Sequence, residues 1–317
     1  MRHAFVTGGA GFLGRQVIHS LARRGWRITA LVRRQLEIPG AALALADLRD
    51  RACVLAAMPD EVDAVFHIAA NIDFNASRAQ QFSDNLDGTE NLLAAALARR
   101  ARRFVFTSTA GVWGLDHQRF DEASSRHPTG IAYLDSKVAA EAAVQRAIQR
   151  GLHAVILNPG HIVGRGSGWD SLFRGLRAAQ VLAVPSGAAS WCHVDAVARA
   201  EVEAADHGEN GANYLLGGCD ASYVEFSAAV ASQLGVRAPR AAPAVLVHTM
   251  ARVGSWRAKL SGRTSELTPD LAKIMCARML FSSARAADAL DYRPPELAAL
   301  IQSSLPLAVP SSDWQGV

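Results

Sequence analysis

Short apolar runs alternate with amphipathic stretches along residues 1–160. The runs have the length of buried parallel strands, and the stretches have helical spacing, as Leu13, Val17 and Leu21 illustrate. Strands are predicted at residues 4–7, 27–32, 43–46, 64–68, 103–107 and 154–157, and helices at 12–24, 51–58, 80–100 and 131–149. This alternation implies a parallel sheet with helices on both faces, the doubly wound α/β class.

The pattern loosens after residue 160. Residues 164–168 are rich in glycine and predict a loop, and residues 236–243 resemble a linker. Residues 245–280 have a helical pattern that is interrupted around Ser261-Gly262-Arg263. We therefore predict a core in residues 1–160, and a mixed region in residues 161–317 that completes the core and forms a smaller substrate-binding part. The apolar segment 245–256 fits a lid over a bulky substrate, a piece of core or a dimer contact.

Composition narrows the class of protein. Half of the 317 residues are hydrophobic and a fifth are charged, which favours a large core over disorder. The net charge of +4 comes without a basic stripe interleaved with aromatic residues, so nucleic-acid binding is not expected. The amino terminus has no signal-peptide pattern, and no apolar run is long enough to span a bilayer. The four cysteines form no C-x-x-C pair, which fits a cytoplasmic protein, and His117, His161 and His193 lack metal-ligand spacing.

Three glycines follow the first predicted strand and open the first predicted helix. Gly8, Gly11 and Gly14 have the spacing G-x-x-G-x-x-G. Gly8 and Gly11 permit a tight turn and a close approach to a pyrophosphate, and Gly14 permits close packing of helix on strand. The helix amino terminus adds amide donors and a partial positive charge. The loop predicts a dinucleotide cofactor.

The end of the second strand indicates which dinucleotide is preferred. An acidic residue there would accept hydrogen bonds from a ribose 2′-hydroxyl, but this strand ends at Arg33-Arg34. A guanidinium favours a 2′-phosphate through charge-assisted hydrogen bonds. NADP is therefore predicted over NAD, with NAD still possible.

Tyr133 and Lys137 are spaced i, i+4, so both lie on one face of the predicted helix. A nearby ammonium lowers the pKa of a phenol, which predicts that Lys137 tunes Tyr133 for proton transfer to or from a substrate oxygen. The strand at 103–107 ends in the hydroxyl residues Thr107, Ser108 and Thr109, at the edge where α/β folds bind ligands.

Together these motifs resemble those of the extended short-chain dehydrogenase/reductases, over nearly the whole chain. The matching segments, in chain order, are Thr7–Gly14, Asp47-Leu48, His67-Ile68-Ala69-Ala70, Asn85–Leu92, Thr107-Ser108-Thr109, Tyr133-x-x-x-Lys137, Asn158-Pro159-Gly160, His193-Val194-Asp195 and Leu290–Pro294. The strand leading into Asn158-Pro159-Gly160 and the tail Phe281–Arg285 are most similar to the branch of 3β-hydroxysteroid dehydrogenases, dihydroflavonol reductases and 3-keto-acid reductases.

The resemblance implies a Rossmann-type sheet, a homodimer and an NAD(P)-dependent oxidoreductase. It assigns Tyr133 as proton donor, Thr109 as the group that positions the substrate oxygen, and Lys137 as the group that holds the nicotinamide ribose. Threonine stands where many members have serine, and Asn85 would support the site. The implied cofactor-binding residues are Gly8, Gly11, Phe12, Leu13, Gly14, Arg33, Asp47, Leu48, Ala69, Ala70, Ser108, Tyr133, Lys137, Pro159, Gly160 and Ile162.

The expected reaction interconverts a ketone or aldehyde and an alcohol on a hydrophobic small molecule that is steroid-, flavonoid- or β-keto-acid-like. Two alternatives stay open. A nucleotide-sugar epimerase or dehydratase shares the same core motifs, and a non-catalytic NADP-binding sensor would need only the dinucleotide site.

Overall fold

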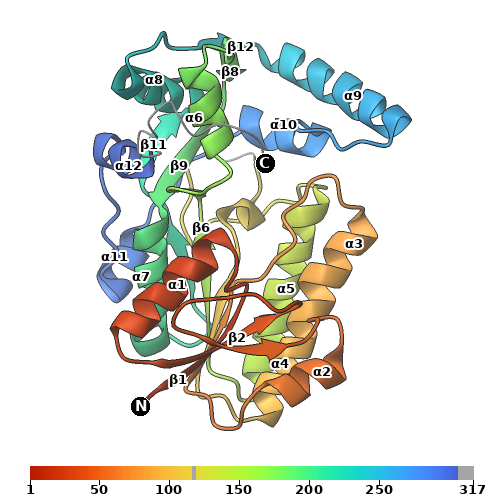
Figure 1. The fold of residues 1–317 in the computed structure, drawn as a ribbon, viewed down its shortest axis with the longest axis vertical. Coiled ribbons are helices and arrows are strands. Elements are labelled where there is room, and N and C mark those ends of the chain that lie inside the picture. The colour runs from red at the N-terminus through yellow and green to blue at the C-terminus, as the bar shows by residue number, and fades with distance from the viewer. Residues whose placement is uncertain (116–118, 306–317) are drawn as a thin grey trace.

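The computed structural model describes residues 1–115 and 119–305. Its centre is a seven-stranded parallel sheet with the order β10-β6-β5-β4-β1-β2-β3 (Figure 1). The strands are β1 (His3–Thr7), β2 (Arg27–Val32), β3 (Ala42–Leu45), β4 (Ala64–His67), β5 (Phe104–Thr107), β6 (Ala154–Pro159) and β10 (Asn213–Leu216). The predicted Rossmann-type sheet is confirmed, and its six predicted strands lie within two residues of their expected ends.

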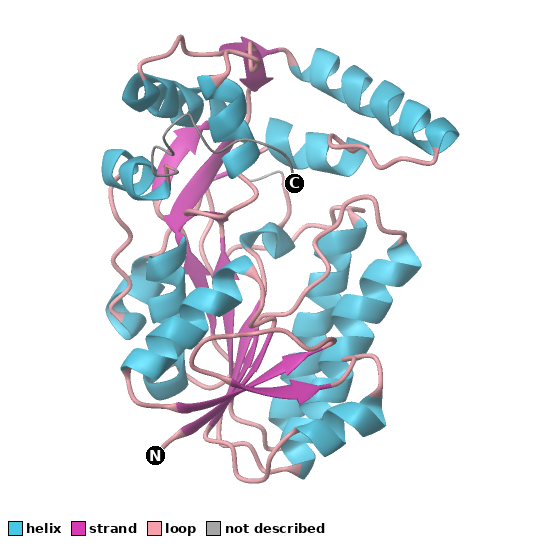
Figure 2. Ribbon diagram, viewed as in Figure 1, coloured by secondary structure: helices cyan, strands magenta, loops and turns pink. Residues whose placement is uncertain are grey.

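Helices cover both faces of this sheet (Figure 2). Alternate residues of β1 point to opposite faces, so Val6 packs with α1 (Phe12–Arg23) and α7 (Val194–His207). Phe5 packs on the other face with α2 (Arg51–Ala57), α4 (Gly88–Ala98) and α5 (Ala132–Gln149). The two apolar layers hold the carboxyl ends of the strands at one edge.

The helix predicted at residues 80–100 is wrong as a single uninterrupted element. The structure has α3 (Arg78–Phe82), then a π-helical turn (Ser83–Asp87), then α4. A π turn widens the helix by one residue per turn and is frequent at functional sites. Here it sets the direction of the Asn85 side chain.

The second part of the chain contributes to two regions. β10, α7 and α11 (Ala284–Leu290) complete the Rossmann half, which residues 1–160 do not build alone. An upper lobe contains a sheet of β7 (His161–Val163), β9 (Ala188–His193), β11 (Cys219–Ser222) and β13 (Arg278–Met279), with helices α6 (Asp170–Arg177), α8 (Tyr223–Leu234) and α12 (Leu297–Ser304). Its core is aromatic: the rings of Trp191 and Phe226 stack with centroids 3.9 Å apart.

Two further helices form an arm on the upper lobe. The residues predicted to be a linker contain β12 (Arg240–Ala242), which pairs with β8 (Ala183–Pro185) and leads into α9 (Ala244–Ser261). The predicted interruption is present, because Gly262 ends α9 in the left-handed conformation and α10 (Pro269–Cys276) follows. Figure 1 shows α9 projecting away from the rest of the lobe.

Candidate functional site

The predicted site residues gather where the strands of the parallel sheet end. Thr7, His67 and Thr107 close the neighbouring strands β1, β4 and β5, and Pro159 closes β6. The strand order reverses between β1 and β4, which is where open α/β sheets bind ligands. The glycine loop follows β1, so it lies at this switch point.

The glycine loop is packed too closely to accept side chains. Gly8 has φ +72°, and a Cβ there would lie 2.6 Å from the Ala69 nitrogen. A Cβ on Gly14 would lie 2.1 Å from the Gly8 oxygen, because α1 crosses directly over the turn. Phe12 and Leu13 begin α1, whose first turn faces this loop. The loop therefore has the cradle that the pyrophosphate of a dinucleotide requires.

A buried hydrogen-bonded chain connects the loop to α4. The Thr7 hydroxyl pairs with His67 Nδ1 at 2.7 Å, and His67 Nε2 pairs with the Thr89 hydroxyl at 2.9 Å. Burial and the charge of Lys137 lower the pKa of His67 to about 3, so this imidazole is neutral. The Ala69 amide donates to the Thr7 hydroxyl at 3.3 Å, which fixes the segment of Ala69 and Ala70 beside Gly8.

Asn85 extends this polar network to α5. Its side-chain amide nitrogen donates to the Ser136 hydroxyl at 2.9 Å and to the Asn71 carbonyl at 3.0 Å. Its carbonyl oxygen accepts the Asn71 amide at 2.6 Å. Ser136 lies between Tyr133 and Lys137 on α5, so the structure places Asn85 in contact with the helix that carries both residues.

Tyr133 and Thr109 meet at the mouth of the site. The Gly111 amide donates to Thr109 Oγ1 at 3.3 Å, in the 3₁₀ turn Ala110–Trp113, and this contact fixes the threonine rotamer. Burial raises the pKa of Tyr133 to about 12, and a side-chain hydrogen bond with Thr109 acts in the opposite direction. The phenol is therefore protonated at neutral pH.

The Lys137 ammonium is not directed at the Tyr133 phenol, as the i, i+4 spacing had suggested. Its ammonium donates to the Thr107 carbonyl at 2.7 Å and lies 4.1 Å from the centroid of the Phe106 ring, turned toward the sheet. It is absent from the groups that shift Tyr133, so the expected lowering of the phenol pKa by Lys137 is not found here. Burial lowers the pKa of Lys137 to about 7, opposed by the charges of Glu141 and Glu201.

Glu201 on α7 belongs to the same buried cluster, and no sequence motif pointed to it. Its Oε1 accepts the Thr107 hydroxyl at 2.7 Å, while Oε2 is buried and has no partner among the described residues. Burial raises the pKa of Glu201 to about 7, opposed by Thr107 and Lys137. Thr107 thus connects Lys137, through its carbonyl, to Glu201, through its hydroxyl.

Arg33, Asp47 and Leu48 lie apart from the tyrosine, at the ends of β2 and β3. Arg33 is exposed just beyond β2. Asp47 accepts hydrogen bonds from Arg49, which hold its pKa down at about 2, and the charge of Arg33 adds a smaller effect. The Leu48 carbonyl accepts from the Asn91 side chain at 2.9 Å.

The remaining predicted residues follow β5 and β6, on the other side of β1 and β4 from Arg33 and Asp47. Gly160 leaves no room for a side chain, because a Cβ there would lie 2.4 Å from the Ser190 oxygen. Ile162 follows in β7, and the Ser108 hydroxyl is buried with no partner in the described part of the chain. This orphaned hydroxyl and the close-packed glycines fit a bound dinucleotide.

The apolar surroundings of Tyr133 were missed by the sequence analysis. The Phe74 ring meets the tyrosine ring edge-on, with centroids 5.7 Å apart. Ile274 of α10 and Met279 of β13 belong to the same apolar cluster, together with Leu115. These residues come from four separate segments, so only the folded chain brings them together.

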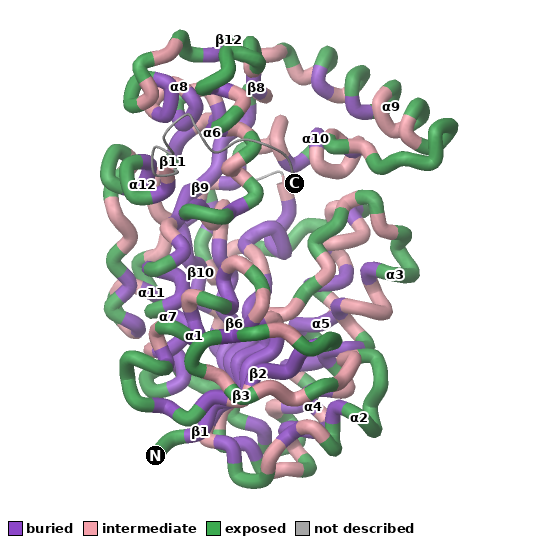
Figure 3. Tube along the Cα trace, in the orientation of Figure 1, coloured by how far each residue is buried: buried purple, intermediate pink, exposed green. Residues whose placement is uncertain are grey.

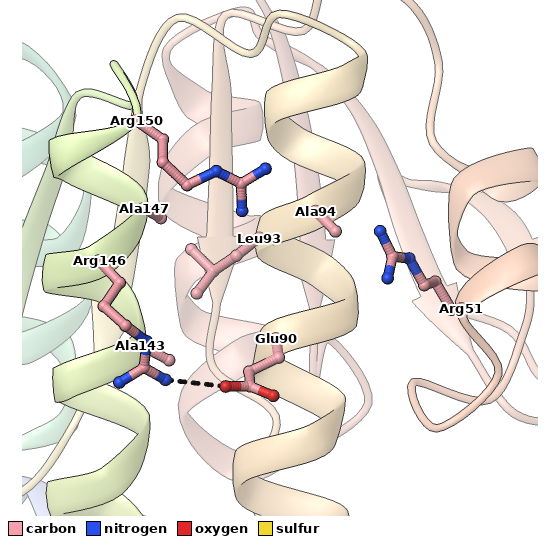
Figure 4. Close-up of a pocket in the computed structure, with 8 residues that line it drawn as sticks. All are labelled: Arg51, Glu90, Leu93, Ala94, Ala143, Arg146, Ala147 and Arg150. Atoms are coloured by element: carbon pink, nitrogen blue, oxygen red, sulfur yellow. Dashed lines mark hydrogen bonds and ion pairs between the residues drawn. The ribbon is translucent and has the colours of Figure 1, made fainter.

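A separate hollow of about 210 Å³ lies on the outer side of α2, α4 and α5 (Figure 4). Arg51, Arg146 and Arg150 line it, and Arg146 pairs with Glu90 at 2.8 Å. Arg146 and Arg150 are roughly 20–25 Å along α5 from Tyr133, at 1.5 Å per residue, so the hollow is not part of the tyrosine site.

Two classes of feature are absent from residues 1–115 and 119–305. No helix there is long and apolar enough to cross a membrane. No group of three or more His, Cys, Asp or Glu side chains there could hold a metal ion, and His117 lies outside the described residues.

Comparison with known proteins gives a consistent grouping. Residues 4–217 match the model of the NAD dependent epimerase/dehydratase family. The chain is 32% identical over 234 residues to sterol demethylase protein B of Methylococcus capsulatus, covering 67% of this chain and 69% of that protein. It is also 32% identical over 225 residues to 4-hydroxy-2-methyl-3-oxo-4-farnesyl-3,4-dihydroquinoline-1-oxide ketoreductase of Stigmatella aurantiaca, covering 67% of each chain. The crystal structure of gox2253 has a TM-score of 0.81 and 26% identity, covering 96% of this chain and 97% of that one.

Proposed function

The chain belongs to the NAD dependent epimerase/dehydratase family, as its resemblance to the extended short-chain dehydrogenase/reductases predicted, and on that premise we propose that it reduces a ketone on a bulky hydrophobic molecule. It is a nicotinamide-dinucleotide-dependent oxidoreductase. The observation that carries the proposal is the protonated Tyr133 phenol, held by Thr109 and surrounded by Phe74, Ile274 and Met279.

The proposed mechanism gives each side chain one task. The dinucleotide, when bound, supplies the hydride for reduction or accepts it for alcohol oxidation. Tyr133 donates its phenolic proton to the substrate oxygen, and Thr109 holds that oxygen beside it. Lys137, fixed by the Thr107 carbonyl, would hold the nicotinamide ribose, and the buried Ser108 hydroxyl would face the cofactor.

The apolar surroundings of Tyr133 support a hydrophobic substrate over a nucleotide sugar. Phe74, Leu115, Ile274 and Met279 offer no hydrogen-bonding side chain for a sugar hydroxyl. The ketoreductase relative is named for a farnesylated substrate, which has the same apolar character. A nucleotide-sugar epimerase remains the second candidate because of the family to which the chain belongs.

Tyr133→Phe tests the mechanism. Loss of the phenolic proton should lower kcat for carbonyl reduction by about 100- to 10,000-fold, while the Kd for NADPH changes little. Initial rates over a panel of steroid, flavonoid and β-keto-acid ketones, with fluorescence titration of NADPH, measure both. An undiminished rate would remove Tyr133 from the mechanism, whereas tightly retained NAD without net turnover would favour the epimerase.

Arg33→Asp tests the cofactor preference. We propose that the exposed Arg33 guanidinium pairs with the 2′-phosphate of NADP, so its reversal to a carboxylate should lower the NADP to NAD affinity ratio about 10- to 100-fold. Arg34→Asp is the matched control, because the neighbouring arginine carries the same charge. An unchanged ratio in Arg33→Asp would reject this role.

Two wider predictions accompany the proposal. The helix pair α4 and α5 is proposed as the face of a homodimer, and light scattering that finds a monomer would reject it. A cytoplasmic location also stays a prediction.

A further inference from the structure

Helix α9 carries an unusual concentration of exposed apolar side chains. Among the described residues, twelve large hydrophobic side chains are exposed, and six of them lie on this one 18-residue helix. Trp256 is 63% exposed and Leu260 is 69% exposed. Exposed apolar patches of this kind mark surfaces that bind a partner. The six are Val245, Leu246, Met250, Val253, Trp256 and Leu260.

The exposed residues form a single stripe along α9. Leu246, Met250, Val253, Trp256 and Leu260 are spaced by three or four residues, which is one face of a helix. Val247 and Ala251 lie on another face and pack on Ala272 of α10. The stripe therefore points away from α10, so α9 has two apolar faces, and the described residues cover only one of them. Figure 3 shows exposed and buried positions interspersed along α9.

Along the chain, the charged residues around the stripe are all basic. Six of the 33 basic residues, and none of the 29 acidic residues, lie between Glu225 and Glu266. The rest of the chain is slightly acidic, although the whole chain has a net charge of +4. Arg252, Arg257 and Lys259 are exposed on α9 and make no ion pair with any described residue.

We propose that α9 docks the protein onto the surface of an anionic lipid bilayer. An interfacial helix combines an apolar stripe, an aromatic residue and flanking cations, and α9 has all three. Cations next to the stripe attract anionic headgroups while the stripe enters the acyl boundary. A second copy of the chain fits less well, because two such helices would bring like charges together.

The arm also connects this surface to the tyrosine site. Ile274 of α10, the helix beneath α9, belongs to the apolar cluster that includes Tyr133. Beyond α9, the Ser265 amide donates to the Asn75 side chain at 2.9 Å, and Asn75 follows Phe74. A docked α9 would thus hold the mouth of the site close to the lipid. This last step rests on the proposed function, because it assumes that the substrate is hydrophobic.

Vesicle binding of the full chain tests the docking without substrate or cofactor. The protein should pellet with vesicles that contain about one third phosphatidylglycerol, and at least tenfold less with pure phosphatidylcholine. Raising the salt from about 0.1 M to about 1 M should release most of it, because screening shortens the reach of the charges. Failure to bind the anionic vesicles overturns the proposal and leaves the proposed reaction untouched.

Variants locate the contact. Leu246→Ser/Met250→Ser/Trp256→Ser should abolish vesicle binding, and Arg252→Gln, Arg257→Gln or Lys259→Gln should each weaken it about fivefold. Leu55→Ser/Val138→Ser is the matched control, since both residues are exposed apolar side chains away from α9 and should leave binding unchanged. Equal binding by the stripe variant and the wild type overturns the assignment to α9. Loss of self-association in that variant, without vesicle binding by the wild type, assigns the stripe to a second copy instead.

The wild-type protein gives an independent readout, should the triple variant fail to fold. Brominated lipid should quench the emission of Trp256, and the quenching should disappear in Trp256→Phe. Quenching that persists in Trp256→Phe would show that another part of the chain meets the lipid.

Discussion

Helices α5 and α9 each have 18 residues, yet they treat polar and apolar side chains in opposite ways. Helix α5 buries eight residues, including the charged Lys137 and Glu141. Helix α9 buries only Val247 and Ala251 and leaves its tryptophan and leucines exposed. The comparison shows that charges can be buried where neighbours satisfy them, whereas apolar side chains stay exposed where the fold offers no second covering surface.

The partners of Glu141 explain why α5 tolerates buried charge. Its carboxylate accepts hydrogen bonds from Asn158 at 2.6 Å, Arg126 at 2.6 Å and Asn213 at 3.2 Å. Its charge also favours the protonated form of Lys137. The Glu141 carboxylate is itself buried, although Arg126 is exposed, and removal of a buried charged acceptor that serves several donors is strongly destabilising.

Removal of the Glu141 carboxylate should therefore produce the largest difference in unfolding free energy between variants of the two helices. Glu141→Leu should lower the free energy of unfolding by about 3–5 kcal/mol, because three donors lose their acceptor. Lys259→Leu on α9 should change it by less than about 0.5 kcal/mol. Urea unfolding measures both, and Glu141→Gln, with a smaller loss, is the milder variant. Equal losses on α5 and α9 would contradict the comparison.

The buried carboxyl group of Glu201, on the face of the sheet opposite to α5, should also make stability depend on pH. Burial raises the folded-state pKa of Glu201 to about 7, so its contribution is fully present below the unfolded value of 4.5 and is lost as pH rises toward 7. The loss is of the order of 3 kcal/mol, at about 1.4 kcal/mol per pKa unit, reduced by coupling to Lys137.

Glu201→Gln should remove this decline and retain the hydrogen bond from Thr107. The buried His67 and His161, whose pKa values are lowered to about 3 and about 4, contribute the opposite slope below pH 6.5. The measurement is therefore the difference between wild-type and Glu201→Gln stability at pH 4.5, 5.5 and 7. Glu203→Gln controls for loss of a carboxylate from α7. Parallel profiles for wild type and Glu201→Gln would refute the role of Glu201.

The same glycine-to-alanine substitution should lower stability in the core and raise it in the arm. Gly14→Ala in α1 should lower the free energy of unfolding by about 1–3 kcal/mol, because its Cβ would lie 2.1 Å from the Gly8 oxygen. Gly254→Ala in α9 meets nothing closer than the Ser265 hydroxyl at 3.4 Å, so helix propensity should raise stability by up to about 1 kcal/mol. Thermal unfolding of both variants measures the two stability changes. Changes of the same sign would contradict the prediction.

The sequence predicted the Rossmann half well, since local patterns there agree with the fold. Runs such as Phe104–Thr107 are buried on both faces, and Gly8 and Gly14 have a spacing that few other structures require. The π turn at Ser83–Asp87 left no signal, because Leu86 is its only apolar residue and a single position cannot distinguish a π turn from an α-helix.

The tyrosine site could be predicted only in part. Spacing placed Tyr133 and Lys137 on one helix face, but it could not predict the direction of the Lys137 ammonium. That direction is set by the Thr107 carbonyl, which lies on β5. Phe74, Ile274 and Met279 come from distant segments, so no local pattern could join them to Tyr133. The apolar pattern of residues 245–256 indicated a helix, but only the tertiary structure shows that most of its apolar side chains face outward.

The π turn before α4 has a consequence for how this chain tolerates length changes. The π turn between α3 and α4 contains one residue more than a regular α-helical turn. Deletion of a single residue between Ser83 and Asp87 would therefore join α3 and α4 into one continuous α-helix. In that shorter helix the Asn85 side chain would be rotated by about 100° around the helix axis, and its hydrogen bonds to Asn71 and Ser136 would be lost. The extra residue thus places Asn85 where its side chain connects the Asn71 segment to the helix that carries Tyr133.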